Sequence, residues 1–502
     1  MVRVLRRRSG TAAIAAAVIL AASLGPEPAR AAQRRPSIRL VSTRSEVTLG
    51  RRRDYPVPLD VGIFVASIGA PLEIRAARPS YRSPIEATQV LGDGTVRPLP
   101  ADVVDGWNGL SGFLRVKAID DSGTLVDRFA ADFCPAGDDR ERADDSGPDV
   151  AVYPSFGCAT SPFTMGAVWG IDRGWATNIV DPYGYYGSDA VSTQPMLDLP
   201  DGRYTVHVSI ARMYRHLFSI AKVDASTTVG VTLETTRHCR SDCYAPVRAP
   251  AAGRAASSVD APEESVPAID RPDRATLPNL IPLPAWNLDV RPSRKTGRDY
   301  LNFAATVWDS GPAPLVVEGF RRPGTGVMDA YQYFYRDGEP VGRARVGTLD
   351  YDAKRGHQHW HFEQFARYSL LDADRAQVVR SHKVSFCLAP TDPIDLTRPG
   401  AEWQPYSVGL DTACGGEGSL WVREVLDAGW GDTYYQFLRG QSFDITDLAN
   451  GTYFVRVEAN PLGLLHEGNR RDDVTTRAIV LKGTPGHRRV VVPPWRGIDS
   501  EG

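Results

Sequence analysis

The chain of 502 residues is longer than one domain of ordinary size, so its length predicts two. Hydrophobic residues make up 42% and charged residues 24%, as in soluble globular proteins. The 58 basic and 60 acidic residues nearly balance, so the overall charge gives no support to a nucleic-acid or membrane-surface partner.

The first 31 residues resemble a secretory signal peptide. The basic start MVRVLRRRSG precedes the apolar stretch TAAIAAAVILAASLG, and Ala29 and Ala31 have the small-x-small arrangement of a signal-peptidase site. A membrane anchor is the alternative, but the apolar run of about 14 residues is shorter than the ~20 that a spanning helix needs. We therefore expect cleavage after Ala31 and a secreted, extracellular mature chain with no membrane span.

The rest of the chain consists of two related halves. Four stretches recur in the same order: RDYPVPLDVGIFVASIGAPLEIRA (53–76) and RDYLNFAATVWDSGPAPLVVEG (298–319), the segments around Cys134 and Cys387, Gly174–Trp175 and Gly429–Trp430, and LPDGRYTVHVSI (199–210) and LANGTYFVRVEA (448–459). Chance similarity between strand-rich sequences is the alternative, and the common order disfavours it. We infer an internal duplication with domains at 36–245 and 276–495, joined by an Ala/Pro-rich linker at 246–275.

Both halves have the sequence pattern of β-strands. Runs such as YTVHVSI and TYFVRVEA alternate in polarity, and the turn signals DG and NG precede them. We expect an all-β protein of two tandem β-sandwich-like domains. Export would make the six cysteines disulfide candidates. The duplication predicts three pairs: Cys134 with Cys158, Cys387 with Cys414, and Cys239 with Cys243.

Three of the nine histidines fall within five positions, in GHQHWHFE (356–363). The neighbouring aromatic residues and the following ARYSLLD favour a strand, in which alternate side chains share one face. We therefore expect His357, His359 and His361 to converge on one metal ion. Imidazole ligands suit zinc, copper, iron or nickel, so the spacing leaves the metal open.

Two other interpretations of the histidines are possible. His357, His359 and Glu363 have the His-x-His-x3-Glu spacing of cupins, but the flanking glycines of that motif are missing and His361 would have no role. The second is a secreted β-sandwich binding or adhesion protein with a non-catalytic metal site. A protein of that kind would have no need of the lysine and tyrosine described next.

Three separated segments resemble the catalytic domain of the lysyl oxidase family, over about residues 285–485: GHQHWHFEQFARYSLLDAD, SHKVSFCL and GDTYYQFLRGQSFDITDLANGTYFVRVEANP. The resemblance implies that the three histidines bind copper. It also implies that Lys383 and Tyr434 form the cofactor lysine tyrosylquinone; Tyr435 is adjacent, and the register favours Tyr434. This chain departs from the animal enzymes in having fewer cysteines in the domain, and KRG where they have a cysteine and a further histidine.

The resemblance implies a copper-dependent amine oxidase. Its substrates would be O₂ and a primary amine such as peptidyl lysine, and its products an aldehyde, ammonia and hydrogen peroxide. A quinone provides the electron sink that no encoded side chain provides, and its formation requires copper rather than redox-inert zinc. Asp432 and His382 are candidates for the base that removes the α-proton. Asp432 is favoured because residues two apart on a strand share a face, here with Tyr434.

The first half lacks these residues. When the sequences of the two halves are aligned by their Phe-Cys and aromatic landmarks, the histidine stretch aligns with DGWNG (105–109), Lys383 with Ala130 and Tyr434 with Ile179. We therefore expect residues 36–245 to form a degenerate lysyl-oxidase-like domain without the site. Such a domain would pack on the catalytic one, shape its entrance or bind a partner.

Overall fold

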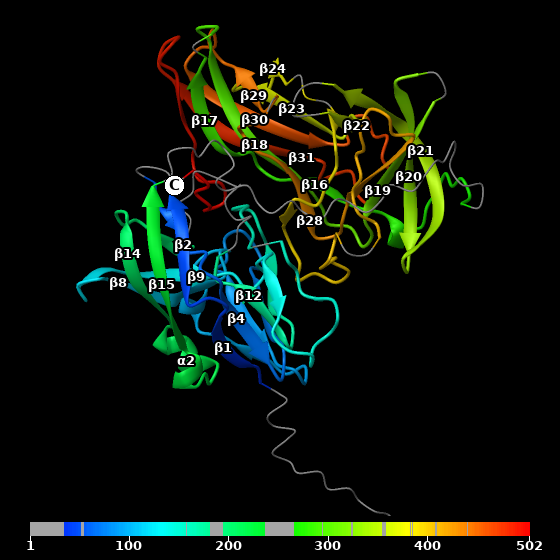
Figure 1. The fold of residues 1–502 in the computed structure, drawn as a ribbon. Helices are drawn as coiled ribbons and strands as arrows, with labels where there is room; N and C mark the ends of the chain where they lie inside the picture. Colours follow the sequence, from blue (N-terminus) through cyan, green and yellow to red (C-terminus); the bar gives the residue numbers. More distant parts are fainter. Residues whose placement is uncertain are drawn as a thin grey trace, which may run out of the picture.

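The structure is a computed structural model. It describes residues 35–51, 55–156, 158–180, 194–235, 266–293, 295–322, 325–353, 358–381, 383, 385–406, 409–438 and 440–501. Nearly all regular structure in these residues is strand, which confirms the expected all-β class. The described helices are short; α2 (Arg212–Leu217) lies at the edge of the first half, which is the lower, blue to green part of Figure 1.

Among its described residues the first half forms a sheet of order β1-β4-β12-β10, a sheet of order β11-β5-β6-β7, a sheet of order β2-β15-β14-β8-β9, and a short pair β3-β13. Alternating burial, as along β14, sends every second side chain into a common core. The bounds are β1 (Ser37–Ser42), β2 (Glu46–Arg51), β3 (Val57–Pro58), β4 (Ile63–Ile68), β5 (Leu72–Ala77), β6 (Glu86–Val90), β7 (Val96–Pro98), β8 (Leu110–Asp120), β9 (Leu125–Phe133), β10 (Arg140–Arg142), β11 (Gly166–Ile171), β12 (Trp175–Asn178), β13 (Met196–Leu197), β14 (Gly202–Ile210) and β15 (Ser226–Thr235).

The second half forms three larger sheets from its described residues. Their orders are β16-β18-β28-β26 with β17 and β29 also paired to β18, then β25-β22-β21-β20-β19-β27, and β24-β23-β30-β31-β32. The bounds are β16 (Leu280–Pro282), β17 (Trp286–Pro292), β18 (Asp299–Asp309), β19 (Leu315–Arg321), β20 (Val327–Arg336), β21 (Glu339–Asp352), β22 (His359–Glu363), β23 (Ala366–Leu371), β24 (Gln377–Arg380), β25 (Ser385–Phe386), β26 (Asp392–Pro393), β27 (Trp421–Leu426), β28 (Trp430–Tyr434), β29 (Ser442–Asp444), β30 (Gly451–Ala459), β31 (Val474–Lys482) and β32 (Arg489–Val491).

The two halves share strand pairings. In the first half β11 pairs with β5 and β12 with β4, and in the second β27 pairs with β19 and β28 with β18. The turns from β11 to β12 and from β27 to β28 each contain a left-handed glycine, Gly174 (φ 75°) and Gly429 (φ 91°), a conformation that glycine adopts without steric cost. Disulfides join Cys134 to Cys158 and Cys387 to Cys414, as the duplication predicts. These correspondences support the proposed duplication. The third predicted pair, Cys239 and Cys243, lies outside the described residues.

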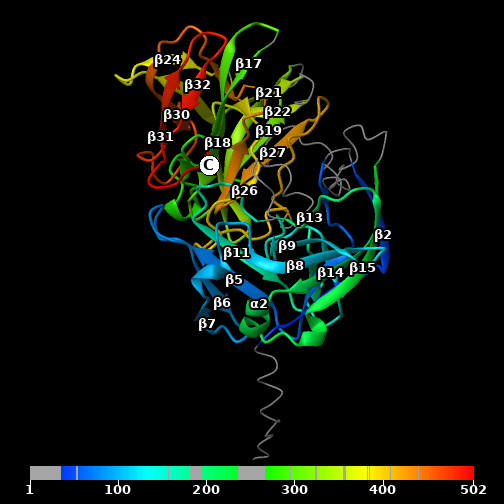
Figure 2. The ribbon, with the colours of Figure 1, turned by 90° about the vertical axis from the view of Figure 1, so that its left-hand side faces the viewer.

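The halves pack directly on each other where β11 of the first meets the β26 region of the second (Figure 2). The amide of Met165 donates to the Ile394 carbonyl (2.6 Å), and the Leu396 amide to the Gly166 carbonyl (2.9 Å). Phe163 of the first half belongs to a hydrophobic cluster whose other buried members come from the second half. The backbone of one half therefore extends a sheet edge of the other.

The predicted linker is described only from residue 266 onward. Val266 is buried against the second half, and the Ile269 amide donates to the Arg343 carbonyl (2.9 Å). Ile269 also occupies the space where a Cβ on Gly342 would lie. These apolar side chains order residues 266–275 on the second half, which therefore begins before residue 276.

The expected signal peptide lies outside the described residues. Within the described part of the chain, no helix is long and apolar enough to cross a membrane.

Candidate active site

The histidine segment forms the strand β22, as the sequence predicts. It pairs with β21 on one side, where His361 lies opposite Asp350 and His359 opposite Asp352. The rings of His359 and His361 have centroids 4.5 Å apart, with their planes at 78°. Trp360 alternates with them and is fully buried, so the two imidazoles share one face. His357, the third expected ligand, lies outside the described residues.

The donor set on this face suits a transition metal. Two adjacent imidazoles are ligands that copper accepts readily, and His361 is only 3% exposed, so a metal ion there would be shielded from water. The described residues contain no complete group of three His, Cys, Asp or Glu side chains arranged around one ion. The pair His359–His361 therefore fits copper as part of a site that needs a further ligand.

Lys383 and Tyr434 meet beside this strand. The Lys383 Nζ atom lies 4.3 Å from the centroid of the Tyr434 ring and 4.9 Å from that of Phe386. Phe386 links the two parts of the site. It pairs with Phe362 of β22, and its ring lies edge-on to Tyr434 at 4.9 Å.

Asp432 shares the tyrosine's strand and face. It is 3% exposed, and burial raises its pKa well above the ordinary value, while the Lys383 charge opposes the rise. Burial and the negative charge of Asp432 raise the pKa of the Tyr434 phenol. The fold therefore places the Lys383 amine over the Tyr434 ring, and the Asp432 carboxyl lies near enough to both for its charge to act on them. His382, the other candidate base, lies outside the described residues.

A second buried carboxylate was not anticipated from the sequence. Glu424 on β27 is fully buried, and one of its oxygens accepts the Leu388 amide (3.1 Å). Burial raises its pKa well above the ordinary value, and the charge of Asp432 adds to the rise. Its negative charge also raises the pKa of Tyr434. A single glutamate in an ordinary strand carries no sequence signal for such a role.

The Cys387–Cys414 disulfide connects the tyrosine to the histidine strand. The Tyr434 hydroxyl donates to the Cys387 carbonyl (3.0 Å), and the Cys414 carbonyl accepts the Trp360 amide (3.0 Å). Trp360 lies between the two described histidines. The crosslink therefore fixes the distance between the two parts of the site.

Tyr435 points away from Lys383 into the junction of the two halves. Its hydroxyl donates to the buried carboxylate of Asp392 (3.3 Å to Oδ1), which also accepts from Thr160 of the first half (2.8 Å). Its ring lies 5.9 Å from that of Trp286. The structure thus separates the two neighbouring tyrosines, and Tyr434 is the one beside the amine. Thr160 and Asp392, like Glu424, were missed from the sequence because they approach only in the folded chain.

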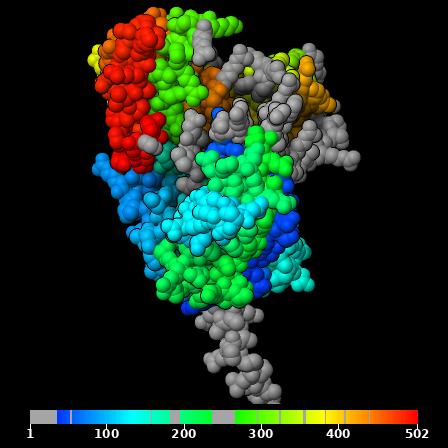
Figure 3. Space-filling model, turned by 60° about the vertical axis from the view of Figure 1, so that its left-hand side comes forward, coloured from blue at the N-terminus to red at the C-terminus, as the bar shows by residue number. Residues whose placement is uncertain are grey.

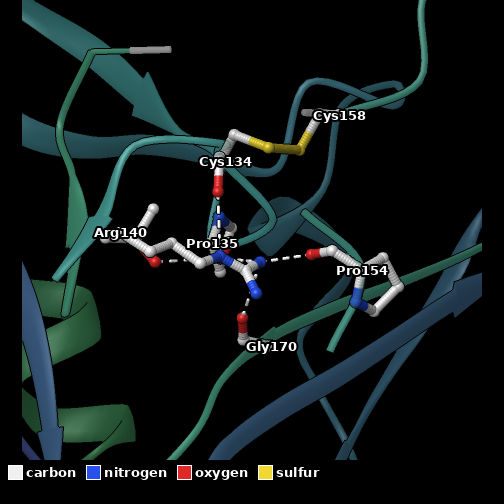
Figure 4. The surroundings of a disulfide bond; sticks show 8 residues. Cys134, Pro135, Arg140, Pro154, Cys158 and Gly170 are labelled. Carbon is white, nitrogen blue, oxygen red and sulfur yellow. Dashed lines mark hydrogen bonds between the residues drawn. A yellow bond between two sulfur atoms is a disulfide. The ribbon is translucent and has the colours of Figure 1, made fainter. Parts of the chain in front are cut away.

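The equivalent region of the first half has different chemistry. Figure 4 shows the Cys134–Cys158 disulfide beside Arg140, whose guanidinium donates to backbone carbonyls that include those of Pro154 and, at 3.5 Å, Gly170. Residues 105–109 form bends rather than a strand. Ala130 is exposed, and Ile179 lies in the hydrophobic core. None of these positions brings an amine to a phenol.

The sequence is similar to known proteins over the part of the chain that contains this site. Residues 342–487 match the family model described as lysyl oxidase. The chain is 32% identical over 129 residues to pig (Sus scrofa) protein-lysine 6-oxidase, covering 25% of this chain and 45% of that protein. It is 32% identical over 120 residues to the human (Homo sapiens) protein of the same name, covering 24% and 25%, and 31% identical over 144 residues to mouse (Mus musculus) lysyl oxidase homolog 4, covering 28% and 16%. The matched part spans less than half the length of these relatives.

Proposed function

We propose, from the match of residues 342–487 to the lysyl oxidase family model, that this protein is a secreted copper-dependent amine oxidase. It would convert primary amines, peptidyl lysine among them, to aldehydes. One O₂ and one water would be consumed, and one ammonia and one hydrogen peroxide released, for each amine oxidised. The cofactor would be lysine tyrosylquinone formed from Lys383 and Tyr434.

The observation that carries this proposal is the approach of Lys383 to Tyr434. The Lys383 Nζ atom lies 4.3 Å from the phenol ring centroid, so only a small movement would bring it to a ring carbon. The bond itself would require loss of a proton from the amine and oxidation of the ring, for which copper and O₂ would be needed. Cation–π attraction holds the amine over the ring before any chemistry takes place. Lys383 lies two residues before β25, which pairs with β22, and the Tyr434 ring packs against Phe386 of β25, so Phe386 connects the amine and phenol to the histidine strand.

His359 and His361, together with His357, would hold copper. When present, copper supplies redox chemistry with O₂, and the quinone supplies a carbonyl that accepts the electrons of the amine. The chain's contribution is to orient the imidazoles. The buried Trp360, whose indole donates to the Gly416 carbonyl (2.9 Å), fixes the strand between them.

Asp432 would act as the base that removes the α-proton of the bound amine. Asp432 lies two residues before Tyr434 on β28, so its carboxyl shares a face with the reacting ring, as a base for proton transfer would need. Its raised pKa makes it a stronger base once ionised, and the positive charge of a nearby amine would favour that ionised form.

Export is part of the proposal. The leader-like start of the chain supports it, and so do the two disulfides of the described residues, because such bonds persist in oxidising compartments.

The test is hydrogen peroxide release by the full-length, copper-loaded protein given a lysine-containing peptide or a free small amine. We expect release that depends on copper, and its loss in Lys383→Ala and Tyr434→Phe. Lys482→Ala and Tyr300→Phe replace residues remote from the site and should behave as the wild type. Full activity in Lys383→Ala would contradict the proposal. Copper binding without turnover of any amine would favour the binding or adhesion protein instead.

A further inference from the structure

A pocket of about 700 Å³ opens at the junction of the two halves. Its walls come from a loop of the first half and from the C-terminal segment of the second, which Figure 3 shows meeting along one side of the molecule, blue against red. The lining residues are Arg78, Tyr81, Arg82, Ser83, Pro84, Arg496, Gly497 and Ile498. Every charged side chain in this lining is an arginine. The pocket volume lies within the range of small-molecule binding sites.

Arg78 is held rigidly in the wall of this pocket. It is only 9% exposed, and its guanidinium donates to the carbonyls of Thr164 (2.9 Å) and Pro162 (2.6 Å). The rings of Tyr81 and Trp107 lie 5.1 Å and 5.4 Å from it. A guanidinium fixed in this way loses little further entropy when it binds a ligand.

The positive charge of the pocket is not balanced by its surroundings. In the described part of the chain, Arg78, Arg82 and Arg496 form no ion pair with a carboxylate. Asp395 is near enough for its negative charge to act on Tyr81, and it is held by the amide and hydroxyl of Thr397; three guanidinium charges against this one carboxylate leave the pocket positive. Burial of Arg78 lowers its pKa, which is the cost of keeping a cation away from water without a counter-charge.

We propose that this junction pocket binds a phosphate or sulfate group carried by a larger ligand. The guanidinium forks of Arg78, Arg82 and Arg496 match the several oxygens of a tetrahedral anion. The hydroxyls of Tyr81 and Ser83 add neutral donors. The rest of the pocket has room for the body of the ligand, against the ring of Tyr81 and the side chain of Ile498.

Such a ligand would contact both halves at once. Arg78 and Arg82 belong to the first half, and Arg496 lies in the turn closed by the hydrogen bonds between Trp495 and Ile498. The ring of Trp495 supports both sides, since it lies 5.1 Å from Tyr81 and the Arg496 guanidinium lies 4.6 Å from it. The proposal is independent of the amine oxidase activity, because none of these residues touches Lys383 or Tyr434 in the described contacts.

The experiment is calorimetric titration of the full-length protein with inorganic phosphate, inorganic sulfate and, as a planar carboxylate control, succinate, all at one ionic strength. We expect saturable binding of phosphate or sulfate in preference to succinate. Whichever of the two binds more tightly identifies the ligand's anionic group.

Arg496→Gln and Arg82→Gln test the assignment of the binding residues. Both side chains are exposed, so these variants should fold, and each should weaken binding by about tenfold because a charge-assisted contact is lost. Arg489→Gln removes an exposed arginine elsewhere and should have no effect. Absence of saturable binding, equal binding of succinate, or unchanged affinity in both pocket variants would overturn the proposal.

Discussion

Each half contains one sheet that has a counterpart in the other half. The two sheets differ at one edge. In the first half the order is β11-β5-β6-β7 and the sheet ends at β7. In the second half the corresponding order β27-β19-β20-β21 continues through β22 and β25, which bring the histidines and Phe386. The strands added at this edge therefore carry the histidines, whereas Tyr434 and Asp432 lie on β28, whose counterpart in the first half is β12.

The two halves also differ at the segment of the first half, residues 105–109, that aligns in sequence with the histidine stretch. In the first half residues 105–109 form bends, and Trp107 among them packs on Arg78 at the proposed anion pocket. The two halves thus place different functional groups on strands that are paired in the same way.

The largest effect is expected for the histidine strand. Replacing His359 and His361 together by alanine should weaken copper binding by more than about 100-fold, since even changes to residues behind a metal ligand cost 10–100-fold. Peroxide release should fall to background. Metal analysis of the purified variants is the measurement, and the exposed His487→Ala is the control. A variant that retains full copper would place the metal site elsewhere.

Asp432→Asn should lower kcat by a factor on the order of 10²–10⁴, the usual contribution of a general base. The wild-type rate should also fall with decreasing pH at values well above those of an ordinary aspartate, because the raised pKa keeps the carboxyl protonated there. The residual activity of Asp432→Asn should lack this acidic limb. A pH–rate profile with the same limb in both proteins would assign the base to another group.

The Asp432 carboxyl should make the free energy of unfolding fall as pH rises, whereas an ion-paired aspartate makes it rise. Its folded-state pKa is raised, so its stabilising contribution is present at low pH and is lost as pH rises through that pKa. Asp432→Asn should therefore lose less stability than the wild type between mildly acidic and neutral pH. Denaturant unfolding at a series of pH values measures this difference.

Removal of either disulfide should lower the stability of the protein, but only one of the two removals should also lower kcat. They close loops of similar length, 24 and 27 residues, so removing either should cost about 3 kcal/mol of unfolding free energy. Only Cys387→Ser with Cys414→Ser should also reduce kcat, by about tenfold or more, because these carbonyls position Tyr434 and Trp360. Equal losses of kcat in both pairs would remove the distinction between the halves.

The smallest effect is expected at the junction. Thr160→Val removes one hydrogen bond to Asp392, at a cost of about 1 kcal/mol. If this contact positions the Tyr434–Tyr435 segment, kcat should fall about fivefold with little change in KM. Thr124→Val changes an exposed threonine of the first half and is the control. A change in stability alone would mean that the contact only joins the halves.

Much of the site was predictable because its signals are local. Alternation placed His359 and His361 on one face and Asp432 with Tyr434 on another, and the structure has both arrangements. Two disulfides followed from the order of repeated landmarks. The long-range contacts had no such signal: Thr160 and Asp392 are 232 positions apart, and Glu424 became notable only through its burial. The register between distant strands decides these contacts, and no short motif encodes it.

The most direct test of the central claim is the mass of the peptides released by trypsin from copper-loaded protein. The account predicts one species that contains the peptides of both Lys383 and Tyr434, joined covalently and stained by quinone redox cycling, with no stained peptide from the first half. Lys383 and Tyr434 recovered in separate, unmodified peptides from protein that oxidises amines would contradict it.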